Sequence, residues 1–182
     1  MGSSSLTLSV ALVGVLGTLF APVLSQRLLA RAQEDLFERE QQASRGRWLQ
    51  EQAEGRLTQR RESYVAVNAA LRRYRVELMN YLWDVSRGLV PAEAVERLES
   101  ARHTHHAAYA EAQMIASTEV LEELEAVVDG LSQGYRQTKN LEEGNPDTDG
   151  SFDEIRDHLS RLWDRLAQMR GVMRADLGVE DS

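Results

Sequence analysis

The chain has 182 residues, enough for one membrane helix and a single domain of ordinary size. Its 29 acidic residues outnumber its 21 basic residues, and the formal net charge is −8 at pH 7. This acidic surplus argues against general binding to nucleic acid, because a phosphate backbone requires a basic surface. The absence of cysteine excludes disulfides, thiolate metal sites and a lipoprotein anchor.

Residues 6–24, LTLSVALVGVLGTLFAPVL, contain no ionisable side chain. As a helix they would reach roughly 28 Å, close to the thickness of a bilayer hydrocarbon core. We therefore predict a transmembrane helix at residues 6–24, preceded by a short polar N-terminus at residues 1–5. The alternative is a signal peptide that is cleaved to release a secreted protein, although residues 1–5 lack the basic residue with which such a signal begins.

The charges that flank this segment predict its orientation. No lysine or arginine precedes it, whereas Arg27 and Arg31 follow it directly. The positive-inside rule then places the N-terminus outside and the C-terminal domain in the cytoplasm. We expect a single-pass protein of the cell membrane with the lipid bilayer as its first partner.

Small residues recur at steps of three and four along the predicted span. The residues of this stripe are Ala11, Gly14, Thr18 and Ala21. Small side chains let helix backbones approach closely in lipid, so the stripe is a candidate contact between membrane helices of two copies. An ordinary lipid-facing helix is the alternative.

The segment after the span lacks proline as far as Arg87. We predict a polar helical stalk over residues 25–56 and a helical bundle over residues 57–178, followed by an acidic tail at 179–182. Apolar residues in the first helix of the bundle keep the spacing of a coiled-coil seam. The seam consists of Leu57, Tyr64, Val67, Leu71, Tyr74, Leu78, Tyr81 and Val85.

Three further helices are predicted from their end signals. Gly88 fits the stop of the long helix, and Pro91 fits the first position of a second helix that runs to about Ala116. A third helix begins at Ser117 or Thr118, which are both good N-caps, and Ser151 with Glu154 forms a capping box that opens the last helix. Because neither Gly nor Pro separates the second and third helices, a single fused arm is the alternative.

The apolar stripes of these helices predict the core. The second helix is expected to bury Val95, Leu98, Arg102, His105, Tyr109 and Ala112. The third is expected to bury Leu121, Leu124, Val128, Leu131 and Tyr135, and the last Ile155, Leu159, Leu162, Leu166, Met169 and Met173. No stretch alternates with the period of a strand. The predicted fold is all-α: an N-terminal transmembrane helix continuing into a long helix that packs in an antiparallel three- or four-helix bundle or coiled coil.

Three side chains of the second helix have the spacing of metal ligands. Glu99, His103 and His106 lie at steps of four and three, which places them on one helix face. We expect this face to be exposed to solvent, so the sequence predicts neither a metal site nor a cofactor, and these three residues are the candidates if a metal binds. His105 falls on the buried stripe, where a hydrogen-bonded core histidine is expected.

Residues 144–150, GNPDTDG, form a predicted loop that resembles the first half of an EF-hand. Asn145, Asp147 and Asp149 fall at ligand positions, but Arg156 occupies the twelfth position, where calcium requires a glutamate. We therefore expect a solvated turn.

The sequence contains no glycine-rich phosphate loop, no G-x-S-x-G and no H-E-x-x-H motif. It predicts a membrane-anchored, non-enzymatic helical scaffold or protein-interaction module at the cytoplasmic membrane face. Its expected partner is another protein or a second copy that associates by coiled-coil packing. Two alternatives are a sensory bundle that binds a ligand beside Tyr74, Tyr81, Trp83 and Trp163, and a metal-binding protein.

Two short stretches, Ile115-Ala-Ser-Thr-Glu-Val120 and Met173-Arg-Ala-Asp-Leu-Gly178, add a resemblance. With the N-terminal span, they resemble uncharacterised single-span membrane proteins with a helical cytoplasmic domain from high-GC Gram-positive bacteria. This resemblance implies a membrane-attached helical domain and no particular activity. The span and charged helix are also similar to the b subunit of rotary ATP synthases, but that likeness ends near Gly88, where this chain folds back.

Overall fold

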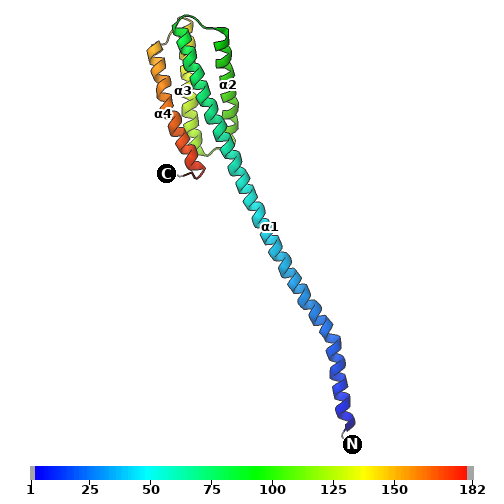
Figure 1. The fold of residues 1–182 in the computed structure, drawn as a ribbon. Helices are drawn as coiled ribbons and strands as arrows, with labels where there is room; N and C mark the ends of the chain where they lie inside the picture. Colours follow the sequence, from blue (N-terminus) through cyan, green and yellow to red (C-terminus); the bar gives the residue numbers. More distant parts are fainter. Residues whose placement is uncertain (1–2, 180–182) are drawn as a thin grey trace. The chain divides into compact units, whose positions relative to one another are not determined.

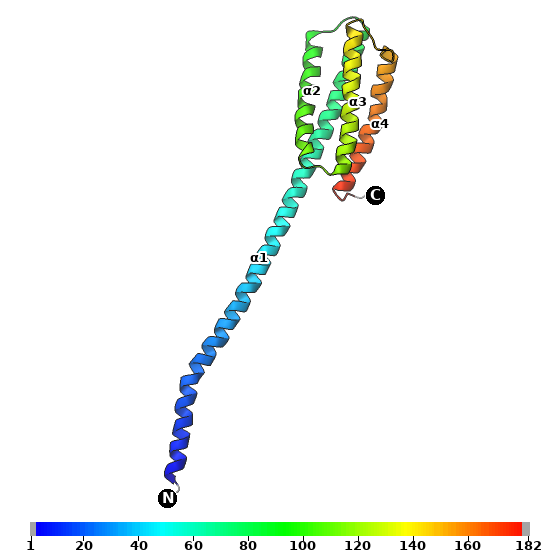
Figure 2. The same cartoon turned by 180° about the vertical axis from the view of Figure 1, so that it is seen from behind.

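The computed structural model describes residues 3–179, with side chains described at 37, 40–42 and 44–179. It contains the helices α1 (Ser3–Ser86), α2 (Ala92–Gln113), α3 (Thr118–Glu142) and α4 (Phe152–Asp176), and no strand within the described range. The chain divides into two units, residues 1–54 and 55–182. In the second unit, four helices pack side by side (Figures 1 and 2). The predicted all-α bundle is confirmed, with four helices.

A turn at Ser117 separates α2 from α3. Ser117 has an extended backbone (φ −68°, ψ 163°), and its hydroxyl accepts a hydrogen bond from the Val120 N–H at 3.4 Å. The Ser117 N–H donates in turn to the hydroxyl of Tyr64 on α1, also at 3.4 Å. The fused-arm alternative is therefore wrong, because the serine cap and its tether to α1 start a new helix without Gly or Pro.

The other end signals are confirmed with one correction. Gly88 adopts a φ of +66°, the left-handed conformation of a helix stop. The capping box of Ser151 and Glu154 is formed as predicted. Pro91, however, is the residue before α2, because its ψ of 147° is extended while its carbonyl already accepts from the Ala94 N–H at 3.0 Å.

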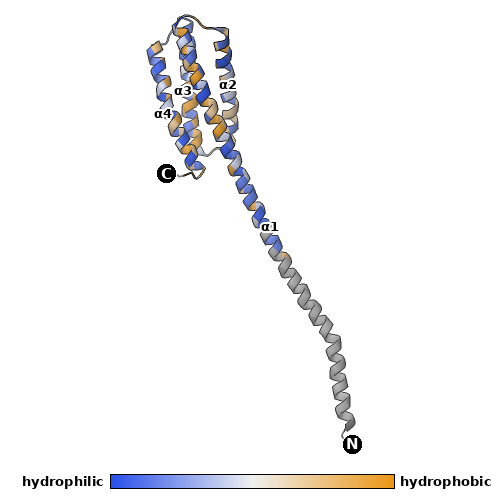
Figure 3. Cartoon of the chain, viewed as in Figure 1, coloured by the Kyte–Doolittle hydropathy of each residue, from blue (hydrophilic) through white to orange (hydrophobic). Residues whose placement is uncertain are grey.

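The core is built on the predicted stripes of α1 and α4. All six predicted residues of α4 are buried, and the α1 seam is buried from Tyr64 to Tyr81. Leu57, at its start, is 49% exposed. Figure 3 shows the apolar residues on the sides of the helices that face one another.

The buried faces of α2 and α3 agree with the prediction in part: Leu98, His105 and Ala112 of α2 and Leu124 and Leu131 of α3 are buried as predicted. Helix α2 buries mostly alanines, whereas Val95 is 38% exposed and Arg102 lies across the Tyr135 ring. The small side chains allow the α2 backbone to pack close to the core, which an apolar stripe chosen by side-chain size does not detect. The fully buried valines of α3 are Val120 and Val127.

Within the residues whose side chains are described, no helix combines the length and hydropathy needed to cross a bilayer. The predicted span at residues 6–24, with its stripe of Ala11, Gly14, Thr18 and Ala21, lies outside those residues. From 44 to 56, in the predicted stalk, every side chain is exposed.

Two glycines bring α3 and α4 together. A Cβ on Gly134 would lie 2.7 Å from Leu159 Cδ2, and one on Gly130 would lie 2.5 Å from Leu162 Cδ2. Both leucines belong to the buried stripe of α4. The α3–α4 contact therefore depends on the absence of side chains at these two positions.

We expect Gly134→Ala and Gly171→Ala to have opposite effects on stability. Gly171 lies inside α4, and a methyl group added there would have no neighbouring atom within 4 Å, so alanine raises the free energy of unfolding by about 0.5–1 kcal/mol through helix propensity. At Gly134 the same gain is outweighed by displacing the fully buried Leu159, an overpacking cost of about 1–3 kcal/mol. Urea unfolding of both variants measures the difference, and equal stabilisation would contradict the close contact.

Candidate functional site

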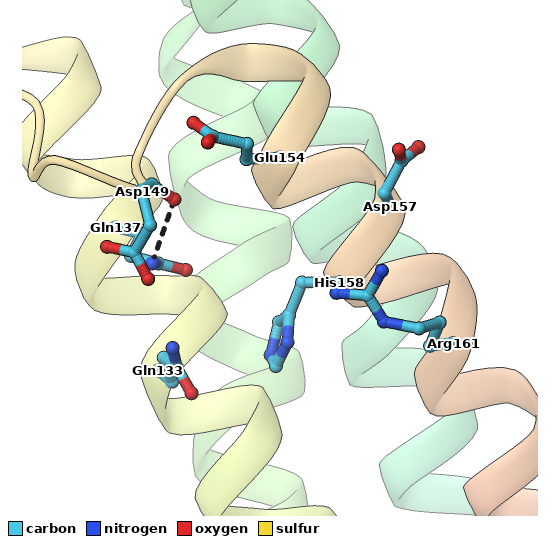
Figure 4. Close-up of a pocket in the computed structure, with 7 residues that line it drawn as sticks. All are labelled: Gln133, Gln137, Asp149, Glu154, Asp157, His158 and Arg161. Atoms are coloured by element: carbon cyan, nitrogen blue, oxygen red, sulfur yellow. Dashed lines mark hydrogen bonds between the residues drawn. The ribbon is translucent and has the colours of Figure 1, made fainter.

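A polar groove lies between α3, α4 and the loop that connects them (Figure 4). We call it the α3–α4 groove, and its volume is about 300 Å³. Its side chains come from one face of α3, the end of the loop and the first turns of α4. They are Gln133, Gln137, Asp149, Glu154, Asp157, His158 and Arg161.

His158 reaches across the groove to the backbone of α3. Its Nε2 lies 2.8 Å from the carbonyl oxygen of Gly130. A carbonyl oxygen only accepts, so Nε2 carries the proton in the neutral imidazole and Nδ1 is left with a lone pair. The helix-to-helix approach permitted by Gly130 and Gly134 thus fixes the tautomer of a groove residue.

Gln137 is fixed by a second backbone carbonyl. Its side chain is only 3% exposed, and its Nε2 donates to the carbonyl oxygen of Asp149 at 3.2 Å. The amide oxygen is left as an acceptor, and Figure 4 shows it pointing toward His158. The groove therefore presents two oriented hydrogen-bond acceptors.

Some charged side chains of the groove already have hydrogen-bond or ion-pair partners, and others do not. The Glu154 carboxylate accepts from the Ser151 N–H at 3.1 Å in the capping box, and Asp157 accepts from Arg156 at 2.9 Å. The side chains of Asp149 and Arg161 make no hydrogen bond or ion pair with any other described residue. One carboxylate and one guanidinium are consequently available to a ligand.

The three candidate metal ligands of α2 are engaged in separate contacts. Glu99 accepts from the Tyr135 hydroxyl at 2.8 Å. His103 Nδ1 lies 3.0 Å from the Glu99 carbonyl oxygen, and the His106 ring packs against His105 at 4.2 Å between centroids. In the part of the chain that the structure describes, no group of three or more histidine or acidic side chains is placed to hold a metal ion.

The four aromatic residues considered for a ligand slot do not line one. Tyr74 and Tyr81 are 1% exposed and fill the core, whereas Trp83 and Trp163 are each 42% exposed on the surface. Tyr74 and Tyr81 are therefore core residues of the predicted seam, and the four rings do not surround a common site.

Tyr81, Lys139 and Glu142 form a closed network. The Tyr81 hydroxyl donates to Glu142 at 2.8 Å, and Lys139, the only lysine of the chain, donates to both partners. Burial alone would lower the pKa of Lys139, but the hydrogen bonds to Glu142 and Tyr81 raise it above its usual value. The amine stays protonated, so it is not a nucleophile.

His105 is buried as predicted, but the expected hydrogen bond is absent. Its ring is stacked on Tyr74 with centroids 4.4 Å apart and planes 5° from parallel, and neither ring nitrogen has a hydrogen-bond partner. Burial lowers the pKa of His105 to about 4, and the neighbouring His106 adds to this shift. His105 is therefore a neutral core residue at pH 7.

An aromatic and basic strip runs along the contact between α1 and α4. The guanidinium groups of Arg72 and Arg75 lie 4.5 and 5.0 Å from the centre of the Trp163 ring. Further along the same two helices, Trp83 packs edge-on against Phe152 at 4.7 Å. We call this strip the Trp–Arg edge, and its residues are Arg72, Arg75, Val76, Trp83, Arg87, Phe152 and Trp163.

Comparison with known proteins adds no relative. The chain matches no family model, no curated protein and no solved structure. Its function is therefore inferred from its own residues.

Sequence reasoning did not identify the α3–α4 groove or the Trp–Arg edge. Gly130 and Gly134, four residues apart on an otherwise apolar helix face, are the signal that α3 makes a close contact. Nothing in the spacing of Gln137 and His158, which lie on different helices, indicates that they face one groove.

Replacement of His105 by phenylalanine is expected to reduce the loss of stability that occurs when the pH is lowered from 7 to 4. The pKa of His105 in the folded protein, about 4, lies below that of a free imidazole, about 6.5. As the pH falls between these values only the unfolded state takes up the proton, so the free energy of unfolding decreases by about 1.4 kcal/mol per pH unit, or about 3 kcal/mol in all. This loss is absent at neutral pH, where the imidazole is uncharged in both states.

Urea unfolding from pH 7 to pH 4 measures this effect, with His103→Gln as the matched control. His103 is an exposed histidine of the same helix, so its replacement tests for a general effect of removing a histidine from α2. The His105→Phe variant keeps an aromatic ring against Tyr74. If its free energy of unfolding depends on pH as steeply as that of the unmodified chain, His105 is not the neutral buried residue described above.

Proposed function

We propose that this chain is a membrane-attached, non-enzymatic interaction module that binds an acidic protein segment through the Trp–Arg edge. The observation that carries the proposal is Trp163, which remains 42% exposed between two guanidinium groups. Tryptophan and arginine are the residue types most enriched among those that dominate binding energy at protein interfaces.

The Trp–Arg edge combines apolar anchors with groups that are already oriented. Val76 and Trp83 are 45% and 42% exposed on the same side of α1 as Arg72. Arg75 is held by a hydrogen bond from its Nε to the Leu159 carbonyl at 2.7 Å, and it lies over Trp163. A partner that covers these rings therefore loses little side-chain entropy in ordering them.

The charge of the edge indicates the chemistry of the partner. Arg72, Arg75 and Arg87 line it, although the whole chain carries a net charge of −8. Complementary charge selects partners and speeds their encounter. An acidic segment with apolar residues fits this surface, whereas the acidic remainder of the chain repels it.

Attachment to the membrane rests on the sequence of residues 6–24, which are uncharged and long enough to span a bilayer as a helix. The module is then held at the cytoplasmic face by the arginines that follow the span. The filled core around Tyr74 and Tyr81 favours this function over a sensory bundle that binds its ligand internally.

We expect a photo-crosslinking residue at Val76 in the full chain to trap a discrete partner in cells. Trp163→Ala removes the anchor and abolishes this product, whereas Trp48→Ala, which removes a 56% exposed tryptophan outside the edge, leaves it. Mass spectrometry of the product is expected to place the crosslink in an acidic segment. A crosslink that survives Trp163→Ala would exclude the Trp–Arg edge as the binding surface.

Deletion of residues 6–24 is expected to move the protein from the membrane pellet to the supernatant of lysed cells. The intact chain is expected to resist extraction at alkaline pH, because a spanning helix stays in the bilayer when peripheral contacts are lost. Full-length chain in the supernatant would contradict membrane attachment.

A further inference from the structure

We infer that the α3–α4 groove binds a small organic cation that carries several N–H donors, a primary alkylammonium or a guanidinium. This inference does not depend on the proposed function, because the groove is formed by α3, α4 and their loop, whereas the Trp–Arg edge is formed by α1 and α4.

The first argument is the orientation of the acceptors. Gln137 and His158 each use their donor nitrogen on a backbone carbonyl, at 3.2 and 2.8 Å. This leaves the Gln137 amide oxygen and His158 Nδ1 as acceptors, and their positions are set before a ligand arrives. Gln137 is 3% exposed, so its amide oxygen has little access to bulk water except through the groove.

The second argument is charge. Three carboxylates line the groove, those of Asp149, Glu154 and Asp157, against the single guanidinium of Arg161. The carboxylates outnumber the guanidinium by two, so the groove attracts a cation. Asp149, whose carboxylate makes no contact with another described residue, is the natural ion-pair partner of the ligand.

The third argument distinguishes an organic cation from a metal ion. Within the described residues, no three histidine or acidic side chains are close enough to surround one ion. Acceptors spread along a groove of about 300 Å³ instead suit a ligand whose donors are separated by several bonds. Such a ligand is either a free diamine or guanidine, or the side chain of a lysine or arginine on another protein.

Titration of the full-length chain in nonionic detergent tests the inference, with agmatine and the dication tetramethylene-bis(trimethylammonium) as probes and the imidazole signals of His158 in NMR as the readout. We expect agmatine to bind with a dissociation constant on the order of 1 mM, which is usual for so small a ligand. This bis-quaternary compound carries the same double positive charge as agmatine but no N–H, so we expect it to bind at least about tenfold more weakly.

Asp149→Asn is expected to weaken agmatine binding about tenfold, because it removes the unoccupied carboxylate from an exposed loop without changing its shape. Asp164→Asn is the matched control, since it removes the same charge from an exposed position of α4 that does not line the groove. His158→Gln keeps a donor for the Gly130 carbonyl but removes Nδ1, and it is expected to weaken binding by a similar factor. Because this variant lacks the imidazole signal, its affinity is measured by isothermal titration calorimetry beside that of the unmodified chain.

Equal affinity for the two cations, or equal effects of Asp149→Asn and Asp164→Asn, would overturn the inference, since either result indicates general attraction to an acidic protein. A pentapeptide with one central lysine separates the two sources of the ligand. Binding tighter than agmatine assigns the site to a protein side chain, and weaker binding assigns it to a free amine. The crosslink at Val76 tests the Trp–Arg edge, and this titration tests the α3–α4 groove. Either result can contradict its own proposal without affecting the other.

Discussion

The bundle depends on where its buried tyrosines place their hydroxyl groups. A tyrosine ring in a core is stabilised by burial, but its hydroxyl must meet a polar partner. Tyr64 of α1 donates to Asp176 of α4 at 2.8 Å and accepts from Ser117 in the α2–α3 turn. At the other end of the bundle, Tyr81 donates to Glu142 of α3. These contacts fix the position of α1 along three neighbouring segments, which an apolar seam alone would allow to slide.

Burial of these polar side chains also changes their pKa values. Burial, together with the hydrogen bond to Asp176, raises the pKa of Tyr64 to about 12. The hydroxyl therefore remains protonated and continues to donate at physiological pH. His105 shows the opposite case: a buried ring that is stacked on Tyr74, has no hydrogen bond to a described side chain, and stays uncharged at pH 7 because burial lowers its pKa.

Two edges of α4 differ in chemistry because different residues fill the space beside them. Toward α3, Gly130 and Gly134 let the backbones approach, and His158 reaches a main-chain carbonyl. Toward α1, Trp163 and the guanidinium groups of Arg72 and Arg75 fill the space with large side chains. One edge is thus a polar groove, and the other is an aromatic and basic surface.

The helical class, the loop before α4, the capping box and the buried face of α4 could all be predicted from the amino-acid sequence. These features are local: a cap depends on residues within one turn, and the stripe from Ile155 to Met173 follows from helical periodicity. The buried faces of α2 and α3 could be predicted only in part, because small residues such as Ala101 and Gly134 are buried by the helices that pack on them and not by their own hydrophobicity. The same is true of the missing hydrogen bond of His105 and of the groove that Gln137 and His158 share. Such contacts join residues far apart in the chain, and their distances depend on how closely two helix backbones pack. The spacing of residues within one helix does not determine that distance.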